Sequence, residues 1–372
     1  MWEQVVAVVA LLLATAAMII VVVLLRRYQP GSSSGQADRE PGTREPARQV
    51  PAFVVNPGKV SRPQALHELA DQLCAEMSLP EPLWFETTRS DPGAGQTREA
   101  LAAGASVVIA AGGDGTVRAV AGALADSGVP MGLLPMGTAN LLARNLDLPV
   151  DGIRSLMSTA LTGTDHPIDL GWIRLTRPPH LDDRESAEQG SGHVPEPHEH
   201  PFLVMAGVGF DAAMVAGADD RLKARMGWMA YFIAGVQHLH GRKTRLTLSV
   251  GDTRAVPLRL RSLLFANCGR LPGGIVLLPD AELDDGWLDI AAIDTRGGLI
   301  GWASLLGKVV LQGIGYRRSF RGEPGSIEFW RARDVMVHLD HPEQIQIDGD
   351  LVGEAIGVAV RVDPGSLIVR TR

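Results

Sequence analysis

Two glycine-rich segments combine residue types that suit phosphate chemistry. Gly-Gly-Asp-Gly-Thr at residues 112–116 follows the apolar run 106–110, and Pro-Met-Gly-Thr-Ala-Asn at residues 135–140 follows the apolar run 131–134. Glycine lets the backbone approach a phosphate closely, and a helix N-terminus offers free N–H groups and a positive dipole end to an anion. Both segments are therefore candidate phosphate loops.

Three side chains in these segments could take part in that chemistry. Asp114 supplies a carboxylate where Mg²⁺ would neutralise phosphate charge, and Thr138 and Asn140 offer short polar groups to a phosphate or a base. A plain strand-to-helix turn is the alternative for either loop alone, but two such loops in one sheet favour a nucleotide site. Neither segment matches the P-loop or the protein kinase signatures.

The elements around these loops alternate between short apolar runs and helical patterns. Strands are predicted at residues 52–55, 83–87, 106–110 and 131–134, with helices at 63–77, 97–103 and 117–126 between them. This order predicts an α/β domain with a parallel sheet over residues 51–166. Ligands bind such sheets at the carboxyl ends of the strands, where both loops fall.

The second half of the chain has a different pattern. Strands follow one another at residues 168–175, 244–250, 258–267 and 288–293, with several more after residue 326. This spacing predicts an antiparallel β-sandwich domain over residues 167–372. Two acidic Asp-Gly segments, at residues 278–289 and 345–351, could each be an ordinary hairpin turn.

The two glycine segments, about twenty residues apart, together resemble the diacylglycerol kinase catalytic-domain family, which includes bacterial lipid kinases and sphingosine kinases. Asn56-Pro57 resembles its V-N-P motif, and Thr87-Thr88 with Gly93 resembles its T-T-x-x-G stretch. The resemblance implies a two-domain fold that binds ATP with Mg²⁺ beside a β-rich lipid-binding domain, whose last strand often returns to the first domain. The implied nucleotide-site residues are Asn56, Thr88, Gly112, Gly113, Asp114, Gly115, Thr116, Gly137, Thr138 and Asn140.

The same resemblance assigns roles to the two acidic segments. Residues 279–286 match the family pattern P-x-A-x-x-x-D-G, which holds a structural Mg²⁺, and the implied ligands are Glu282, Asp285 and the backbone carbonyl of Trp287. Asp350 stands where the family has the Glu of D-G-E, its general base, and is one methylene shorter. A carboxylate there retains the chemistry needed to take a hydroxyl proton. Asp211 is implied to contact a lipid headgroup hydroxyl.

The N-terminus carries a candidate membrane segment. Residues 5–25 contain no charged side chain, and at about 1.5 Å per residue they would span about 31 Å, close to the thickness of a bilayer core. A transmembrane anchor is predicted over residues 1–27 and a flexible linker over 28–50, with a cleaved signal peptide as the alternative. Arg26-Arg27 places the catalytic domains in the cytoplasm of a single-pass cell-membrane protein.

Charge and cysteine content exclude other classes of protein. The net charge of −7, from 35 Lys and Arg against 42 Asp and Glu, argues against a nucleic-acid partner, and two cysteines rule out a disulfide framework. The sequence therefore predicts an ATP-dependent kinase of a membrane lipid, with diacylglycerol as the expected substrate and the bilayer as a partner. A soluble-substrate kinase of the NAD-kinase type and a non-catalytic membrane-tethered sensor are the alternatives, and a homodimer is left open.

Overall fold

A computed structural model gives the fold of this chain. It describes residues 49–149, 152–178, 199–209, 243–251, 253–271, 275–276, 278, 280–295 and 325–372. These residues all belong to one compact unit, Arg48–Arg372. The predicted anchor, all but the last two residues of the predicted linker, and Asp211 lie outside the described residues.

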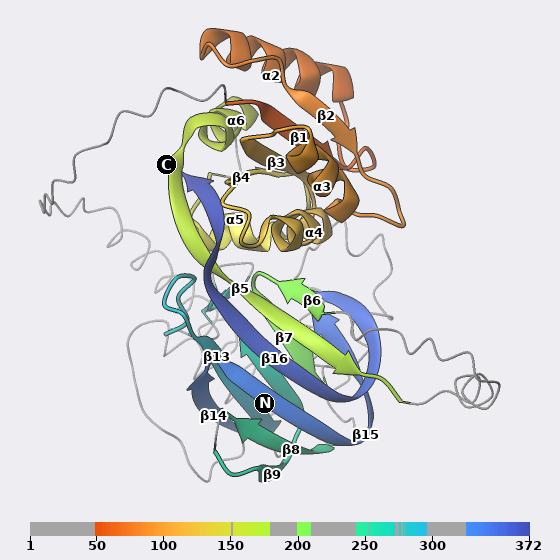
Figure 1. Ribbon diagram of the computed structural model, residues 1–372. Helices are drawn as coiled ribbons and strands as arrows, with labels where there is room; N and C mark the ends of the chain where they lie inside the picture. The colour runs from red at the N-terminus through yellow and green to blue at the C-terminus, as the bar shows by residue number, and fades with distance from the viewer. Residues whose placement is uncertain are drawn as a thin grey trace, which may run out of the picture. The chain divides into compact units, whose positions relative to one another are not determined.

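A parallel sheet forms the first half of this unit, in the order β2-β1-β3-β4 (Figure 1). Its strands are β1 (Pro51–Val55), β2 (Leu83–Glu86), β3 (Val107–Gly112) and β4 (Met131–Pro135). Every residue of β1 and β3 is buried, as expected for central strands that are covered on both faces. This is why these strands appear in the sequence as unbroken apolar runs.

Helices connect and cover these strands. They are α2 (Pro63–Glu76), α3 (Ala94–Ala102), α4 (Asp114–Leu124), α5 (Leu141–Asn145) and α6 (Ile153–Thr162). The buried residues of α4 recur at helical spacing and include Val117, Val120 and Leu124, which face the sheet. Because α4 begins directly after β3 and α5 shortly after β4, both helix N-termini lie at the carboxyl edge of the sheet.

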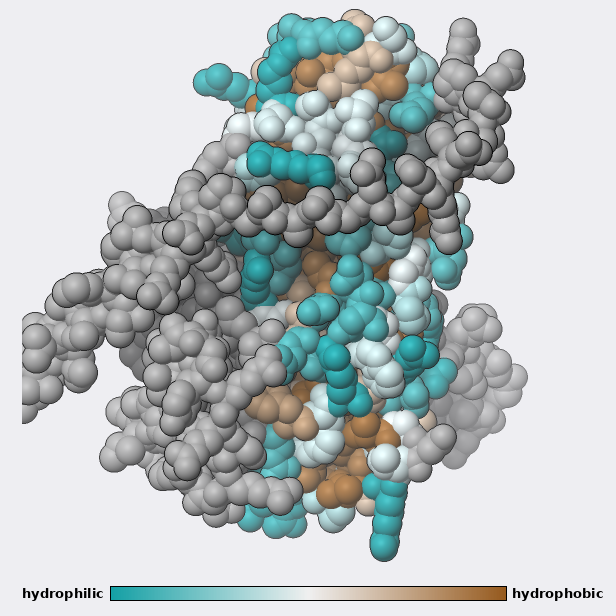
Figure 2. Space-filling model, turned by 90° about the vertical axis from the view of Figure 1, so that its left-hand side faces the viewer, coloured by the Kyte–Doolittle hydropathy of each residue, from teal (hydrophilic) through white to brown (hydrophobic). Residues whose placement is uncertain are grey.

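The second half of the unit is built of antiparallel strands. They are β5 (Thr164–Thr176), β6 (Glu199–Phe202), β7 (Met205–Val208), β8 (Thr244–Val250), β9 (Val256–Leu260), β10 (Ser262–Ala266), β11 (Arg270–Leu271), β12 (Ile275–Val276), β13 (Leu288–Thr295), β14 (Gly325–Ala332), β15 (Asp334–Ile347) and β16 (Asp350–Thr371). The start of β15 pairs with β8 and its end pairs with β7, after an irregularity between His338 and Glu343. Buried and exposed residues alternate at the start of β15, as expected for a strand with one face on the core. On the face of the molecule shown in Figure 2, hydrophilic and hydrophobic residues are interspersed.

Two long strands join the halves. β5 and β16 pair along most of their length, and β16 then pairs in parallel with β4, where Val369 lies opposite Met131. The described strands other than β11 and β12 consequently form one continuous sheet of 14 strands. The hairpin between β15 and β16 is thereby fixed relative to the parallel sheet, because β16 belongs to both halves (Figure 1).

The expected membrane localisation requires a correction. Among the described residues, no helix has the length and apolar character needed to cross a bilayer. The longest described helix, α2, has 14 residues, or about 21 Å, against a hydrocarbon core of about 30 Å. The prediction of a single-pass cell-membrane protein with cytoplasmic catalytic domains is contradicted by this finding, and residues 5–25, on which it was based, lie outside the described residues.

Candidate active site

The two glycine loops meet at the carboxyl edge of the parallel sheet. A Cβ placed on Gly137 would lie 3.0 Å from the Cα of Gly113 and 2.9 Å from Oδ1 of Asn140. Glycine is therefore required at position 137 by the close approach of the two loops. Gly113 is the N-cap of α4, whose first four N–H groups have no partner within the helix and are available to an anion.

Asp114 links the two loops. Its Oδ1 accepts a hydrogen bond from the backbone N–H of Leu141 at 2.6 Å, and its Oδ2 accepts one from Asn140 at 3.1 Å. Asn140 adopts a left-handed conformation with φ of 48°, and its Oδ1 accepts the N–H of Gly137 at 2.9 Å. Burial raises the pKa of the Asp114 carboxyl, although these backbone donors act in the opposite direction.

The segment after β1 is tied to the first glycine loop. The backbone N–H of Asn56 donates to the carbonyl of Ala111 at 2.9 Å, and its Nδ2 donates to Oγ1 of Thr116 at 3.4 Å. Thr116 is buried and occupies the space beside Gly112, where an added Cβ would lie 2.6 Å from the Thr116 Cβ. The contacts among Asn56, Gly112 and Thr116 thus stabilise the conformation of the first glycine loop.

Lys59 brings a cationic side chain to the same loop and was missed in the sequence analysis. Its Cε would lie 3.9 Å from a Cβ placed on Gly113. The position of Lys59 three residues after Asn56, in a turn that follows a buried strand, is the sequence signal that could have identified it.

Two predicted nucleotide-site residues have exposed side chains. The Oγ1 of Thr88 accepts a hydrogen bond from the N–H of Asp91 at 3.0 Å, and the N–H of Thr88 donates to the carbonyl of Asp91 at 2.9 Å. Thr138 directly follows Gly137, which packs against the first glycine loop, and is exposed. The assignment of Thr88 and Thr138 to a nucleotide site stays a prediction.

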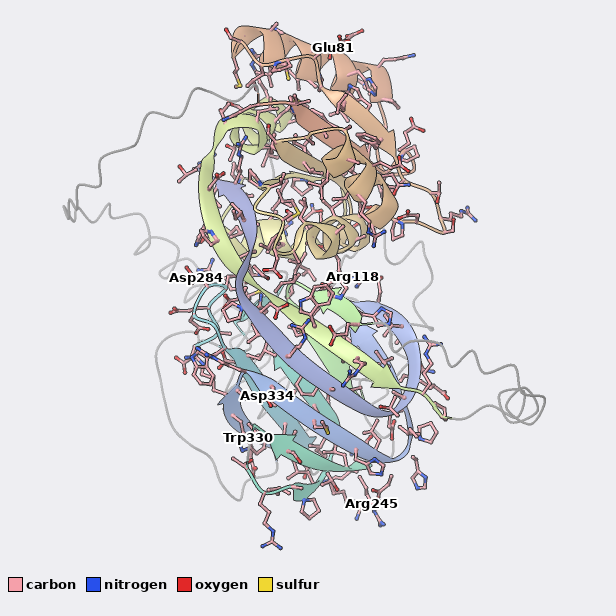
Figure 3. All side chains as sticks on the ribbon, in the orientation of Figure 1. Glu81, Arg118, Arg245, Asp284, Trp330 and Asp334 are labelled. Carbon is pink, nitrogen blue, oxygen red and sulfur yellow. The ribbon has the colours of Figure 1, made fainter. Side chains whose placement is uncertain are left out.

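The predicted catalytic carboxylate lies beside the first glycine loop. A Cβ placed on Gly115 would be 3.5 Å from Oδ2 of Asp350. That same oxygen lies 3.0 Å from Nη2 of Arg118, and Nη1 of Arg118 donates to the carbonyl of Ile347 at 2.6 Å. Arg118, on α4, therefore contacts both strands of the β15–β16 hairpin. Figure 3 labels its position. The side chain of Asp350 remains 58% exposed.

Arg118 was not predicted from the sequence. It stands four residues after Asp114 on α4, and this spacing places both side chains on the same helical face. That spacing was the available signal, but the partner of Arg118 lies 232 residues away along the chain.

Asp348 fixes the hairpin from the other side. Its buried carboxylate accepts backbone N–H groups from Leu203 at 3.0 Å and from Val204 and Met205, each at 2.9 Å. Asp348 and Gly349 both have positive φ, 47° and 90°, as a two-residue hairpin turn requires. Burial raises the pKa of the Asp348 carboxyl, while Arg118 and the three backbone donors oppose that change. The first Asp of Asp-Gly-Asp thus anchors the turn, and the second faces the loop.

The second acidic segment brings one predicted metal ligand into contact with a cationic side chain. Glu282 is exposed, and the carboxylate of Asp285 is paired with the guanidinium of Arg331 on β14. In the part of the chain that the structure describes, no cluster of three or more His, Cys, Asp or Glu side chains is arranged to hold a metal ion. The set of Glu282, Asp285 and the Trp287 carbonyl stays a prediction, and Arg331 already supplies positive charge at Asp285.

The geometry defines a class of protein: one half supplies two glycine loops and the other brings a carboxylate to the first of them, an arrangement suited to a phosphotransferase. Comparison with known proteins identifies the family. The diacylglycerol kinase catalytic domain matches residues 52–173, and the YegS C-terminal NAD kinase beta sandwich-like domain matches residues 204–371. The chain is 32% identical over 248 residues to the "Probable lipid kinase YegS-like" of Pseudomonas aeruginosa (strain UCBPP-PA14), covering 65% of this chain and 72% of that protein. The chain belongs to the diacylglycerol kinase catalytic-domain family and is a kinase of the YegS-like group.

Two further similarities extend the comparison. The chain is 28% identical over 270 residues to the uncharacterized protein sll0036 of Synechocystis sp., covering 71% of this chain but only 54%, about half, of that protein. The crystal structure of a diacylglycerol kinase from Bacillus anthracis str. Sterne matches with a TM-score of 0.61 at 16% identity, covering 87% of this chain and 97% of that one. The prediction of an α/β nucleotide-binding domain followed by a β-sandwich is confirmed.

Proposed function

We propose that this protein transfers the γ-phosphoryl group of ATP to the hydroxyl of diacylglycerol, giving phosphatidic acid. The observation that carries the proposal is the position of Asp350, whose Oδ2 would lie 3.5 Å from a Cβ on Gly115 of the first phosphate loop. Family membership implies the use of ATP. The names of the related proteins support a lipid acceptor, since they include a lipid kinase and a diacylglycerol kinase.

The first glycine loop is the proposed phosphate cradle. The N–H groups at the start of α4 that have no partner within the helix would bind phosphate oxygens. Lys59 would add a positive charge at the same place. Close packing against Gly137 holds the loop in this shape before ATP arrives, so little reorganisation is needed on binding.

Asp350 is the proposed general base. Its carboxylate would take the proton of the lipid hydroxyl while the hydroxyl oxygen forms a bond to the γ-phosphorus and the bond from that phosphorus to ADP breaks. The side chain is 58% exposed, so the proton can afterwards pass to water. Arg118 is a positioning residue, because it holds the Asp350 carboxylate and the Ile347 carbonyl at fixed places beside the loop.

Asp114 suits a Mg²⁺ ion that accompanies ATP. Each of its carboxylate oxygens accepts one backbone N–H and retains a further lone pair for a cation. Such an ion, when bound, would neutralise charge on the transferred phosphoryl group. Asp114 also links the loops, so its replacement is expected to disturb both the cation and the geometry of Asn140.

The experiment that tests the proposal is phosphoryl transfer by the purified full chain. Radiolabelled ATP is supplied with mixed micelles of diacylglycerol, of sphingosine or of phosphatidylglycerol, and with NAD in solution. Labelled phosphatidic acid is the expected product. Label in another lipid would contradict diacylglycerol as the substrate, and label in NAD alone would contradict the lipid-kinase proposal.

A further inference from the structure

The acidic turn before β13 concentrates negative charge. Residues 280–289 include five acidic side chains, and the turn packs against Asp169, whose carboxylate accepts the N–H of Gly286 at 2.6 Å and that of Gly365 at 2.8 Å. Asp284 and Asp285 both raise the pKa of Asp169, in addition to the larger effect of its burial. The family resemblance implies a structural Mg²⁺ at this turn.

Arg331 supplies positive charge at the centre of the turn. It lies opposite Asp289 in the register of β13 and β14. Its guanidinium donates to the Asp285 carboxylate, to Oδ2 of Asp289 at 3.3 and 3.4 Å, and to the backbone carbonyl of Asp280 at 2.8 Å. Two carboxylates and a carbonyl are oxygen ligands of the kind that a hard divalent cation takes.

The other donors around the turn complete its hydrogen bonding. Oδ1 of Asp285 accepts the N–H of Trp287 at 3.0 Å, and Nε2 of His166 lies 3.1 Å from Oδ2 of Asp284. The guanidinium of Arg333 lies over the Trp287 ring, 4.9 Å from its centroid. Because the Arg331 guanidinium already contacts Oδ2 of Asp285, a metal ion bound to that oxygen would lie beside another positive charge and be repelled by it.

Burial strengthens this pairing. The side chains of Asp285 and Asp289 are only 18% and 13% exposed, so their negative charges are poorly solvated and favour a nearby cation. A guanidinium is always protonated in proteins, and that of Arg331 lies between the two carboxylates.

We propose that Arg331 is the resident cation of this turn and takes the place of the divalent ion that the family resemblance implies. The fold of the β-rich half then needs no metal at this position. The proposal concerns the stability of the fold and stands independently of the substrate assigned above.

The test compares thermal unfolding of the full chain in EDTA and in Mg²⁺, without ATP. The wild-type melting temperature is expected to be the same in both. Arg331→Met removes the cation that neutralises two largely buried carboxylates and is expected to lower the melting temperature by about 5 °C in EDTA. Mg²⁺ is expected to restore part of that loss, since the freed carboxylates can bind it.

Two further variants locate the response. Asp285→Asn added to Arg331→Met is expected to abolish the effect of Mg²⁺, whereas Asp114→Asn added to Arg331→Met is expected to leave it unchanged. Arg331→Lys keeps the charge and is expected to show no response to Mg²⁺. The proposal would be overturned if Mg²⁺ raised the melting temperature of the wild type and still did so in Asp114→Asn. It would also be overturned if Mg²⁺ left the melting temperature of Arg331→Met unchanged. If Arg331→Met does not fold, Mn²⁺ binding is measured instead for the wild type and for Asp285→Asn. A Mn²⁺ site that is present in the wild type and lost in Asp285→Asn would contradict the proposal. Equal Mn²⁺ binding by the two proteins would support it.

Discussion

Two acidic Asp-Gly turns in this molecule have similar sequences but different surroundings. Each meets an arginine from another element: Arg331 of β14 at the turn before β13, and Arg118 of α4 at the β15–β16 turn. In the view of Figure 3, Arg118 and Asp284, which belongs to the first turn, lie on opposite sides of the crossing strands β5 and β16. At the first turn the arginine is shared by two largely buried carboxylates, whereas at the second it contacts one carboxylate that is 58% exposed.

The difference shows that an arginine beside an acidic Asp-Gly turn can stabilise the turn in one place and orient an exposed carboxylate in another. Arg331 bonds to Asp285, Asp289 and the carbonyl of Asp280, so its donors are used within the turn. Arg118 bonds to Oδ2 of Asp350 and to the Ile347 carbonyl, and the same Oδ2 lies beside Gly115 of the first glycine loop. A carboxylate that is oriented by an arginine and still open to a substrate is suited to proton transfer.

The strongest test of this comparison separates the two Asp residues of one hairpin. Asp350→Asn removes the proposed base and is expected to lower kcat about 10³-fold, with little change in the melting temperature because the side chain is exposed. Asp348→Ala leaves three buried N–H groups without acceptors and is expected to lower the free energy of unfolding by about 3 kcal/mol. Initial rates and urea unfolding measure the two effects.

Asp340→Asn is the matched control, because Asp340 is an exposed carboxylate on the same strand, β15. It is expected to change neither quantity. Full activity in Asp350→Asn would remove Asp350 from the reaction, and unaltered stability in Asp348→Ala would show that its three hydrogen bonds do not hold the hairpin.

Local chemistry explains which parts of the site could be predicted from the sequence. The glycine loops were found because close backbone approach and helix N-termini depend on consecutive residues, and they meet as the order of elements predicts. Arg118 and Arg331 were missed because their partners come from tertiary pairing: one contacts a hairpin of the other half, and the other lies opposite Asp289 in an antiparallel register. No sequence spacing encodes either contact.

In the fold, too, features set by local sequence were predicted and features set by tertiary pairing were not. The predicted strand 244–250 matches β8 (Thr244–Val250) because its alternating pattern is local. The predicted strand 258–267 is two strands in the structure, β9 and β10, which join different neighbours on either side of Arg261. Helix α6 was not predicted, and its N-cap is Gly152, which offers no side-chain cap as a signal.

A smaller effect is expected when the arginine of the catalytic turn is removed. Arg118→Met is expected to lower kcat about 10-fold and to leave the KM for ATP nearly unchanged, because Arg118 contacts Asp350 whereas the proposed phosphate site is at the N-terminus of α4. Arg118→Lys should recover part of the rate. Steady-state kinetics of both variants, with the melting temperature as a check on folding, provide the measurement.

The double variant shows whether the arginine acts through Asp350. If it does, Arg118→Met should cost little further activity in an Asp350→Asn background, since interacting residues are not additive. An undiminished 10-fold loss in that background would mean that Arg118 acts on something else, for example directly on ATP.

The pH dependence of stability gives the smallest effect and tests the buried side of the hairpin. Because burial raises the pKa of Asp348 in the folded state, the folded chain holds this proton more tightly than the unfolded chain does. Its contribution to stability is therefore fully present below the unfolded pKa and is lost as the pH rises through the folded pKa. The free energy of unfolding of the wild type should fall over that window, and Asp348→Asn, which does not titrate, should remove that part of the decline. An equal pH dependence in both proteins would show that the three backbone donors and Arg118 fully offset the burial of this carboxylate, so that the hairpin is anchored without an electrostatic cost.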